Sequence, residues 1–263
     1  MKVLIRGIFG ISTLSLKGIC GFAPQRLSMI QCANGNHVHI RDNDILDQKL
    51  NRFIQGGVSK LQVITDFDFT LSKFAEEGER CAGSHGVLTY SDILSQEFHR
   101  TSQELFDKYY PIEIDPGMER EEKCRHMVAW WSEEHEAILQ SGLTLHKMKE
   151  AVQGAKIALR GGLDKLFDLV DQHHIPLLIF SAGLGDVLEE VLHQRLPASA
   201  PRPLPAHVHI VSNRMEFAPD GQVVRFRDPL FHVFNKNAGA ILDQPYFTEE
   251  HMQERCNVLL LGD

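Results

Sequence analysis

Short apolar runs alternate with longer stretches of helical periodicity along most of this chain. Four runs are predicted to be strands, because each is short and mostly apolar. They cover Leu61–Thr65 and residues 176–180, 208–212 and 257–261. Helical patterns separate the first three strands, so the sequence predicts an α/β fold in which helices cover both faces of a parallel sheet.

Most of the helical pattern lies between the first two strands. Leu94, Phe98, Leu105 and Tyr109 recur at helical spacing, and Pro111 is expected to end that helix. Further helices are expected over about 119–140, through 145–159, over 163–173 and from about residue 186. Residues 75–160 are therefore predicted to be a helical cap inserted into an α/β core made of residues 51–74 and 161–263. Residues 196–205 are expected to be a proline-rich loop and 218–221 a hairpin turn.

The first 50 residues differ in composition from the rest and are predicted to be a leader. No Asp or Glu occurs between Met1 and Arg41, and the apolar stretch 7–16 is too short to span a bilayer. A basic, acid-poor segment of this kind is typical of targeting to the mitochondrion or the endoplasmic reticulum. The alternative, an unstructured leader on a cytoplasmic enzyme, is the one we favour.

Composition narrows the classes of function. The 263 residues are 43% hydrophobic and carry a formal net charge of -8. A surface of that sign repels DNA and RNA, so a nucleic acid polymer is not the expected partner. We also expect no membrane span and a monomeric chain. The five cysteines are scattered without a CxxC pair, which argues against a zinc site or a disulfide framework and favours a reducing compartment.

Two carboxylates follow the first predicted strand directly. Asp66 and Asp68 are two residues apart, so both can face one pocket while Phe67 points the other way. Like charges this close repel unless a cation lies between them, and magnesium prefers such oxygen ligands. One carboxylate could then attack phosphorus while the other protonates the leaving oxygen. The alternative is a solvated Asp-rich turn, since DxDxT by itself is a weak pattern.

Three further polar groups follow the later strands. The Ser181 hydroxyl and the backbone N–H groups of the Ser181-Ala182-Gly183 turn could hold a phosphate, and Lys236 could neutralise its charge. Asp263, after the last strand, could complete the metal site. Each signal could equally belong to an ordinary turn or a solvated side chain. Their common place after successive strands makes the set specific.

In this order the residues resemble the motif set of the haloacid dehalogenase-like superfamily, from Leu61 to Asp263. Longer segments are similar to one group in that superfamily, the cytosolic type III 5′-nucleotidases that act on pyrimidine and 7-methylguanosine phosphates. The segments that carry this resemblance are 66–74, 109–116, 180–190, 211–213 and 234–236.

The resemblance implies a Rossmannoid core with a helical cap and a magnesium-dependent reaction through an aspartyl-phosphate. Its substrates would be nucleoside 5′-monophosphates such as 7-methyl-GMP, CMP and UMP. The implied roles are Asp66 as nucleophile, Asp68 as proton donor, Asp66, Asp68 and Asp263 as Mg²⁺ ligands, Ser181, Ala182 and Lys236 as phosphate-binding residues, and Glu113 as the residue that recognises the base.

Glu113 fits that role chemically, because a carboxylate accepts from an exocyclic amine and attracts a cationic N7-methylated guanine. Without the resemblance, an acid in water would be the preferred interpretation. Trp130 and Trp131 are adjacent and are expected to point about 100° apart on a helix, so that one could pack in the cap while the other stacks on a base. The alternative, that both are core residues, stays open.

One departure from the family leaves two other functions open. The family continues past the position of Asp263 with a second Asp and further elements, so we expect a truncated chain whose last strand is an exposed sheet edge. The first alternative is a phosphatase of the same fold acting on another small phosphomonoester. The second is an inactive, nucleotide-binding isoform.

Overall fold

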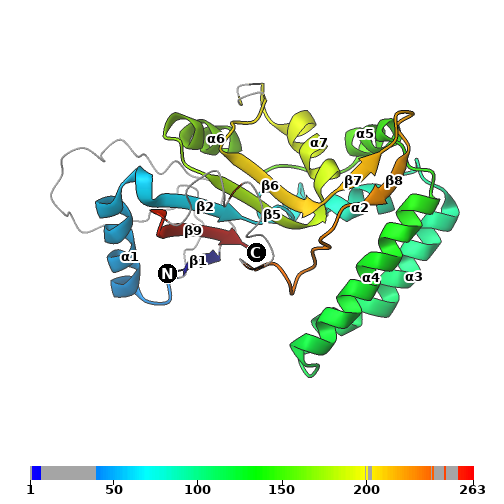
Figure 1. The fold of residues 1–263 in the computed structure, drawn as a ribbon, viewed down its shortest axis with the longest axis horizontal. Coiled ribbons are helices and arrows are strands. Elements are labelled where there is room, and N and C mark those ends of the chain that lie inside the picture. The colour runs from blue at the N-terminus through cyan, green and yellow to red at the C-terminus, as the bar shows by residue number, and fades with distance from the viewer. Residues whose placement is uncertain are drawn as a thin grey trace.

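A computed structural model describes the backbone of residues 2–6 and, with their side chains, residues 40–198, 200, 203–237, 239, 246 and 254–263. Within these residues, five strands form one sheet in the order β1-β9-β2-β5-β6, and every neighbouring pair is parallel. The predicted α/β class with a parallel sheet is confirmed (Figure 1). The strands are β1 (Lys2–Arg6), β2 (Leu61–Thr65), β5 (Leu177–Leu184), β6 (Val208–Asn213) and β9 (Asn257–Gly262).

The register of the sheet brings three strand ends together. Thr65, the last residue of β2, lies opposite Ile179 of β5 and Leu261 of β9. Polar residues that follow these strands therefore leave the sheet at one edge, where ligands bind in open α/β sheets.

The first half of strand β5, residues 177–180, is continuously apolar because both of its faces are buried. Leu177 and Ile179 pack into the larger hydrophobic core, beside Phe167 of α6 (Leu163–Gln172) and Leu188 of α7 (Gly185–Arg195). Leu178 and Phe180 point to the opposite face and pack with Val211, Phe231 and Tyr246. This two-sided burial explains why the strand could be predicted from a short apolar run.

The helical region between β2 and β5 has two parts. Helices α3 (Gln96–Ile114) and α4 (Arg120–Gln140) pack together as a hairpin that projects beyond the sheet (Figure 1). Helices α2 (Ser84–Thr89) and α5 (Leu145–Gly154) instead contact α7 of the core. The β-hairpin β7 (Met215–Phe217) and β8 (Val223–Phe226) contacts α4 through β8. The predicted boundaries of a cap at 75 and 160 stay a prediction.

Several predicted element ends are wrong. Pro111 does not end its helix: α3 continues to Ile114, because Ile112 still packs against the cluster between the two helices and the proline lies on the exposed side. Helix α5 ends at Gly154 rather than near Leu159, which pairs with Ser72 in an isolated bridge. The elements that the sequence analysis missed are β1, α1 (Asn43–Gly56), the one-turn η1 (Val58–Lys60), α2, β3 (Ala75–Glu76) and β4 (Glu79–Arg80).

The last strand is not an exposed edge, contrary to expectation. Strand β1 pairs with β9 along its whole length, from Lys2 opposite Val258 to Arg6 opposite Gly262. Helix α1 also begins inside the segment predicted to be a leader. Residues 7–39 lie outside the described residues, as do 199 and 201–202 of the predicted proline-rich loop, and the role of residues 1–50 stays a prediction.

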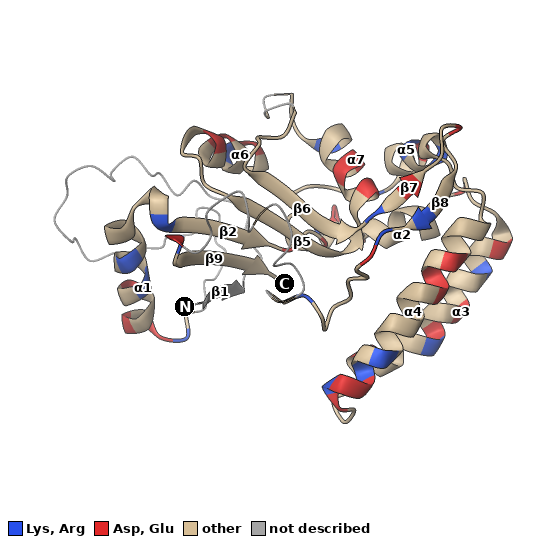
Figure 2. Cartoon of the chain, viewed as in Figure 1, with Lys and Arg blue, Asp and Glu red and all other residues tan. Residues whose placement is uncertain are grey.

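In the described part of the chain, none of the helices is both long enough and apolar enough to cross a membrane. Acidic and basic residues are interspersed along α1, α3 and α4 (Figure 2). This mixed distribution agrees with a surface that does not favour a polyanion.

Candidate active site

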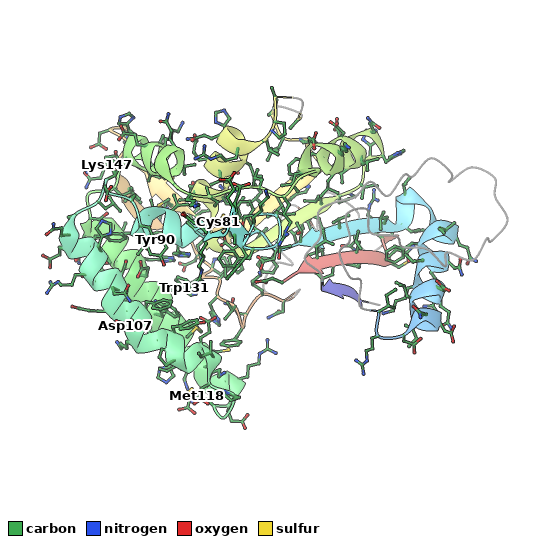
Figure 3. All side chains as sticks on the ribbon, turned by 180° about the vertical axis from the view of Figure 1, so that it is seen from behind. Cys81, Tyr90, Asp107, Met118, Trp131 and Lys147 are labelled. Atoms are coloured by element: carbon green, nitrogen blue, oxygen red, sulfur yellow. The ribbon has the colours of Figure 1, made fainter. Side chains whose placement is uncertain are left out.

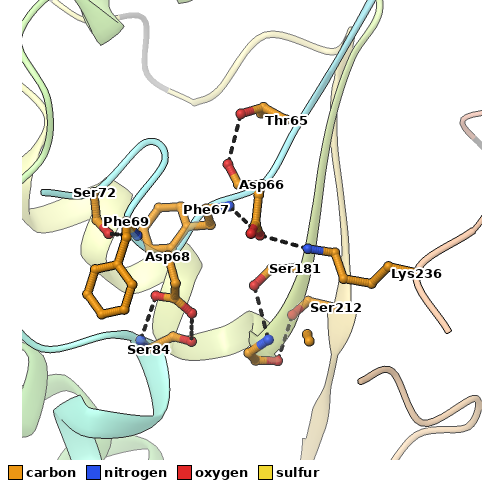
Figure 4. Close-up of polar contacts among 12 residues, drawn as sticks. Thr65, Asp66, Phe67, Asp68, Phe69, Ser72, Ser84, Ser181, Ser212 and Lys236 are labelled. Atoms are coloured by element: carbon orange, nitrogen blue, oxygen red, sulfur yellow. Dashed lines mark hydrogen bonds and ion pairs between the residues drawn. The ribbon is translucent and has the colours of Figure 1, made fainter. Parts of the chain in front are cut away.

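Asp66 is the first residue after β2, and the sheet holds its backbone in place. Its N–H donates to the carbonyl of Leu261 in β9 over 3.1 Å. Its carboxylate Oδ1 accepts from the N–H of Phe67 over 2.8 Å and forms an ion pair with Lys236 Nζ at 2.9 Å (Figure 4). Phe67 itself is fully buried in the core, so the acid and the aromatic ring point to opposite sides, as the sequence predicted.

Asp68 is held by a residue that the sequence analysis did not identify. Ser84, the first residue of α2, donates its N–H to Asp68 Oδ1 over 2.7 Å and its hydroxyl to Oδ2 over 2.6 Å (Figure 4). Burial raises the pKa of Asp68 to about 6, and the negative charge of Asp66 adds to the rise, while the bond from the Ser84 hydroxyl opposes it. The two neighbouring acids therefore have different environments.

The carboxyl end of β5 carries the predicted phosphate-binding residues and is fixed from β6. Ser181 is buried, and its hydroxyl accepts from the N–H of Gly183 over 3.0 Å. The carbonyl of Ala182 accepts from the Asn213 side chain over 2.7 Å, and that of Gly183 accepts from the Ser212 hydroxyl over 2.7 Å. Ser181 and Ala182 thus belong to the strand itself, and α7 begins just after them, at Gly185.

Asn213 also fixes the loop that supplies Lys236. Its side chain exchanges two hydrogen bonds with the backbone of Phe231, both 2.8 Å long. Farther along the same loop, the Asn235 side chain donates to the carbonyl of Leu230 and accepts from the N–H of His232. One buried amide therefore connects the end of β5 to the loop whose lysine meets Asp66.

Asp263 leaves the same edge of the sheet as Asp66, directly after β9. Burial lowers the pKa of the Arg160 guanidinium, and the negative charge of Asp263 opposes that change. That arginine donates to the carbonyls of Thr70 and Phe69, in the loop that follows the two acids. Among the described residues, no three Asp, Glu, His or Cys side chains converge closely enough to hold a metal by themselves.

Glu113 lies near the end of α3 and is connected to the site through its neighbours. Burial raises the pKa of the Glu113 carboxyl, and the positive charge of Lys123 opposes that rise. Lys123 Nζ donates to the Glu113 carbonyl over 2.9 Å and lies 5.6 Å from the centre of the Phe234 ring. Phe234 is two residues from Lys236, so the hairpin meets the loop that supplies this lysine close to Asp66.

The tryptophan pair does not diverge as predicted. The rings of Trp130 and Trp131 are stacked, with centroids 5.3 Å apart and planes 8° apart. Trp130 is buried and also stacks on Tyr109, while Trp131 stacks on His85 of α2 with centroids 4.2 Å apart. Figure 3 shows Trp131 on the hairpin, near its junction with the rest of the molecule. The two indoles nevertheless have different neighbours, Tyr109 of α3 for Trp130 and His85 of α2 for Trp131.

Comparison with known proteins identifies the family. The family model described as pyrimidine 5′-nucleotidase (UMPH-1) matches residues 69–263. The chain belongs to the pyrimidine 5′-nucleotidase family. The resemblance inferred from the sequence is thereby confirmed, and with it the predicted class of enzyme, a 5′-nucleotidase.

The alignments with named members of this family extend over most of the chain. The 7-methylguanosine phosphate-specific 5′-nucleotidase A of Xenopus laevis is 41% identical over 226 residues, which are 86% of this chain and 75% of that protein. The mouse 7-methylguanosine phosphate-specific 5′-nucleotidase is 42% identical over 209 residues, 80% of this chain and 67% of that one. A crystal structure of cytosolic 5′-nucleotidase IIIB bound to cytidine matches with a TM-score of 0.67 and 28% identity, over 82% of this chain and 70% of that chain.

The site of this pyrimidine 5′-nucleotidase family member includes two residues that sequence reasoning did not assign. Asn213 was part of a family-like segment but received no role, although an Asn at a strand end is a recognisable signal for a residue that bonds backbone groups. Ser84 lies sixteen residues after Asp68 in a six-residue helix. No spacing rule in a single sequence connects the two.

Proposed function

We propose that this chain hydrolyses nucleoside 5′-monophosphates to nucleoside and phosphate in the cytoplasm, with 7-methyl-GMP, CMP and UMP as substrates. Family membership supports the reaction class, and the names of the relatives support 7-methylguanosine phosphate as a substrate. One observation carries the mechanism. A carboxylate paired with a lysine and a second carboxyl of raised pKa leave the same strand end, two residues apart.

In the first half of the reaction, Asp66 attacks phosphorus and the bond to the nucleoside 5′-oxygen breaks. Asp68 gives its proton to the departing oxygen, and a pKa near 6 keeps a useful fraction of this carboxyl protonated close to neutral pH. Ser181, the backbone N–H of Ala182, and Lys236 hold the phosphate oxygens. Lys236 can do so without leaving Asp66, since an ammonium group has three donors.

In the second half, the now ionised Asp68 takes a proton from water, which attacks the phosphorus of the aspartyl-phosphate and regenerates Asp66. The chemistry of the donor set suits a magnesium ion, because Asp66, Asp68 and Asp263 offer oxygen ligands only, although these three side chains do not converge by themselves. Magnesium also needs just one or two protein carboxylates when waters and a phosphate complete its shell. Bound there, it would neutralise negative charge on the transferring phosphoryl group.

Glu113 recognises the base in this proposal. Burial alone disfavours its ionised form, and a cationic base such as 7-methylguanine would restore that form by direct attraction. This favours 7-methyl-GMP over UMP, which offers neither a positive charge nor an exocyclic amine.

The test is phosphate release from 7-methyl-GMP, CMP, UMP and phosphoserine, each with magnesium and with a chelator. We expect release from the nucleotides only when magnesium is present, and essentially none from Asp66→Asn. Preferential turnover of phosphoserine would identify a different phosphomonoesterase. Nucleotide binding without release of phosphate would identify an inactive isoform.

A further inference from the structure

The two oxygens of the Asp68 carboxyl group are held by a single residue from another element. Ser84 gives one hydrogen bond to each oxygen, 2.7 Å from its N–H and 2.6 Å from its hydroxyl. A pair of bonds from one residue fixes both the position and the rotation of a carboxyl plane. Each oxygen keeps a second lone pair, so Asp68 can still carry a proton for the reaction.

Ser84 is itself closely surrounded by neighbouring groups. Its side chain is fully buried, and the N–H of Leu184 lies 3.4 Å from its hydroxyl oxygen. The hydroxyl fills the space beside Gly183, because a Cβ added to that glycine would lie 1.8 Å from Ser84 Oγ. The serine is therefore wedged between Asp68 and the end of β5 that carries Ser181 and Ala182.

We infer that Ser84 is a positioning residue, which aims the carboxyl group of Asp68 at the leaving oxygen of the substrate. The inference rests on the proposed function and assigns a further residue to the same reaction. A proton donor must lie within hydrogen-bond reach of the atom that it protonates, and general acid catalysis contributes roughly 10²- to 10⁴-fold to the rate. Rotation of the Asp68 carboxyl would forfeit part of that factor.

The chemistry of the leaving group supplies a specific test. When the phosphorus–oxygen bond to a nucleoside breaks, the 5′-oxygen needs the proton of Asp68. When the bond to p-nitrophenol breaks, the phenolate leaves without one. A misaimed Asp68 should therefore impair only the first reaction, whereas a general structural defect should impair both.

The experiment compares kcat/KM of the full chain and of Ser84→Ala on CMP and on p-nitrophenyl phosphate, both with magnesium. For Ser84→Ala we expect a loss of about 10-fold or more on CMP, arising in kcat rather than KM, and a loss of less than about 3-fold on p-nitrophenyl phosphate. Ser84→Thr, which retains the hydroxyl, should recover most of the CMP activity. Ser84→Cys, which keeps only a weak donor, provides the same comparison if Ser84→Ala does not fold.

Ser102→Ala is the matched control, because Ser102 is also buried and also donates to a carboxylate, that of Glu134, over 2.6 Å. It should keep the parental ratio of the two rates. Equal losses of Ser84→Ala on both substrates would overturn the positioning role while leaving the proposed function intact. A parent chain that releases phosphate from neither substrate would overturn both.

Discussion

Asp66 and Asp68 are neighbouring residues of one type that lie in different environments. The ammonium group of Lys236 lies against the first carboxylate, at 2.9 Å, and balances its charge. The second is held by Ser84, and its burial raises the pKa to about 6. Carboxylates whose environments separate in this way commonly divide into a nucleophile and a proton donor.

Gly183 should be intolerant of any side chain. In Gly183→Ala the new Cβ would lie 1.8 Å from Ser84 Oγ and 2.9 Å from Asp68 Oδ2. We expect the serine and the acid to be displaced, kcat on CMP to fall by about 100-fold, and the free energy of unfolding to fall by about 1–3 kcal/mol from overpacking. Gly154→Ala is the control, since a Cβ there meets nothing within 4 Å. Steady-state kinetics measures the change in kcat, and urea unfolding measures the change in the free energy of unfolding. A kcat of Gly183→Ala equal to that of the parent would contradict this account.

At the scale of elements, the α3–α4 hairpin contacts the loop of Lys236 through the start of α4. Arg120 donates to the carbonyl of Phe234 over 2.7 Å, and the Phe234 ring packs against the cluster between the helices. Glu113, near the end of α3, is tied to the same place through Lys123. The hairpin can therefore hold Glu113, which we propose recognises the base, near the loop of Lys236 without belonging to the sheet.

Glu113→Gln should separate recognition of the base from chemistry. The substitution removes the charge that attracts 7-methylguanine, and hydrogen bonds to charged groups contribute about 1.5–3 kcal/mol. We expect kcat/KM for 7-methyl-GMP to fall by about 10-fold or more, with p-nitrophenyl phosphate turned over at the parental rate. Glu104→Gln, at an exposed position of the same helix, should change neither rate. If Glu113→Gln lost both reactions equally, the residue would serve the hairpin structure instead.

The sequence predicted elements best where burial is two-sided or strongly periodic. The first four residues of strand β5 are apolar because they pack into two cores, and α4 was placed to within a residue. Helix ends were harder, since the packing of Ile112 that carries α3 past Pro111 is a tertiary contact. The order of acids, serine and lysine after the strands predicted a candidate site, and the structure pairs two of its members, Asp66 and Lys236, at 2.9 Å. Ser84 could not be found, because α2 is too short to show a period and the bond to Asp68 exists only in the folded chain.

At the scale of the whole molecule, two buried histidines join separate segments of the chain. His85 of α2 stacks on Trp131 of α4, with ring centroids 4.2 Å apart. His135 of α4 stacks on Phe226 of β8, with centroids 3.6 Å apart. Among the described residues, neither ring has a partner for its buried Nε2. These rings therefore pack the hairpin against α2 and β8 as neutral aromatic groups.

Burial of the two histidines predicts a loss of stability in acid. Burial lowers the pKa of His85 to about 3, assisted by the charge of His135, and lowers that of His135 to about 4. Because the unfolded chain titrates each imidazole near its ordinary pKa of 6.5, it binds more protons than the folded chain at pH values between those limits. Each histidine should then cost about 2 kcal/mol of unfolding free energy by pH 4.5, and nothing above about pH 7.

The variant His85→Phe isolates one of these contributions, because carboxyls of raised pKa, such as that of Glu134, act with the opposite sign. A phenyl ring can keep the stacking on Trp131 while it removes the titrating group and the unpartnered nitrogen. We expect the free energy of unfolding, measured with urea, to change with pH between 7 and 4.5 less steeply in His85→Phe than in the parent. The difference in slope should be up to about 1.4 kcal/mol per pH unit. His146→Gln, at an exposed position on α5, should give the parental slope. A parental slope in His85→Phe as well would mean that His85 gains a proton without unfolding, and that the contact between α2 and the hairpin opens in the native state.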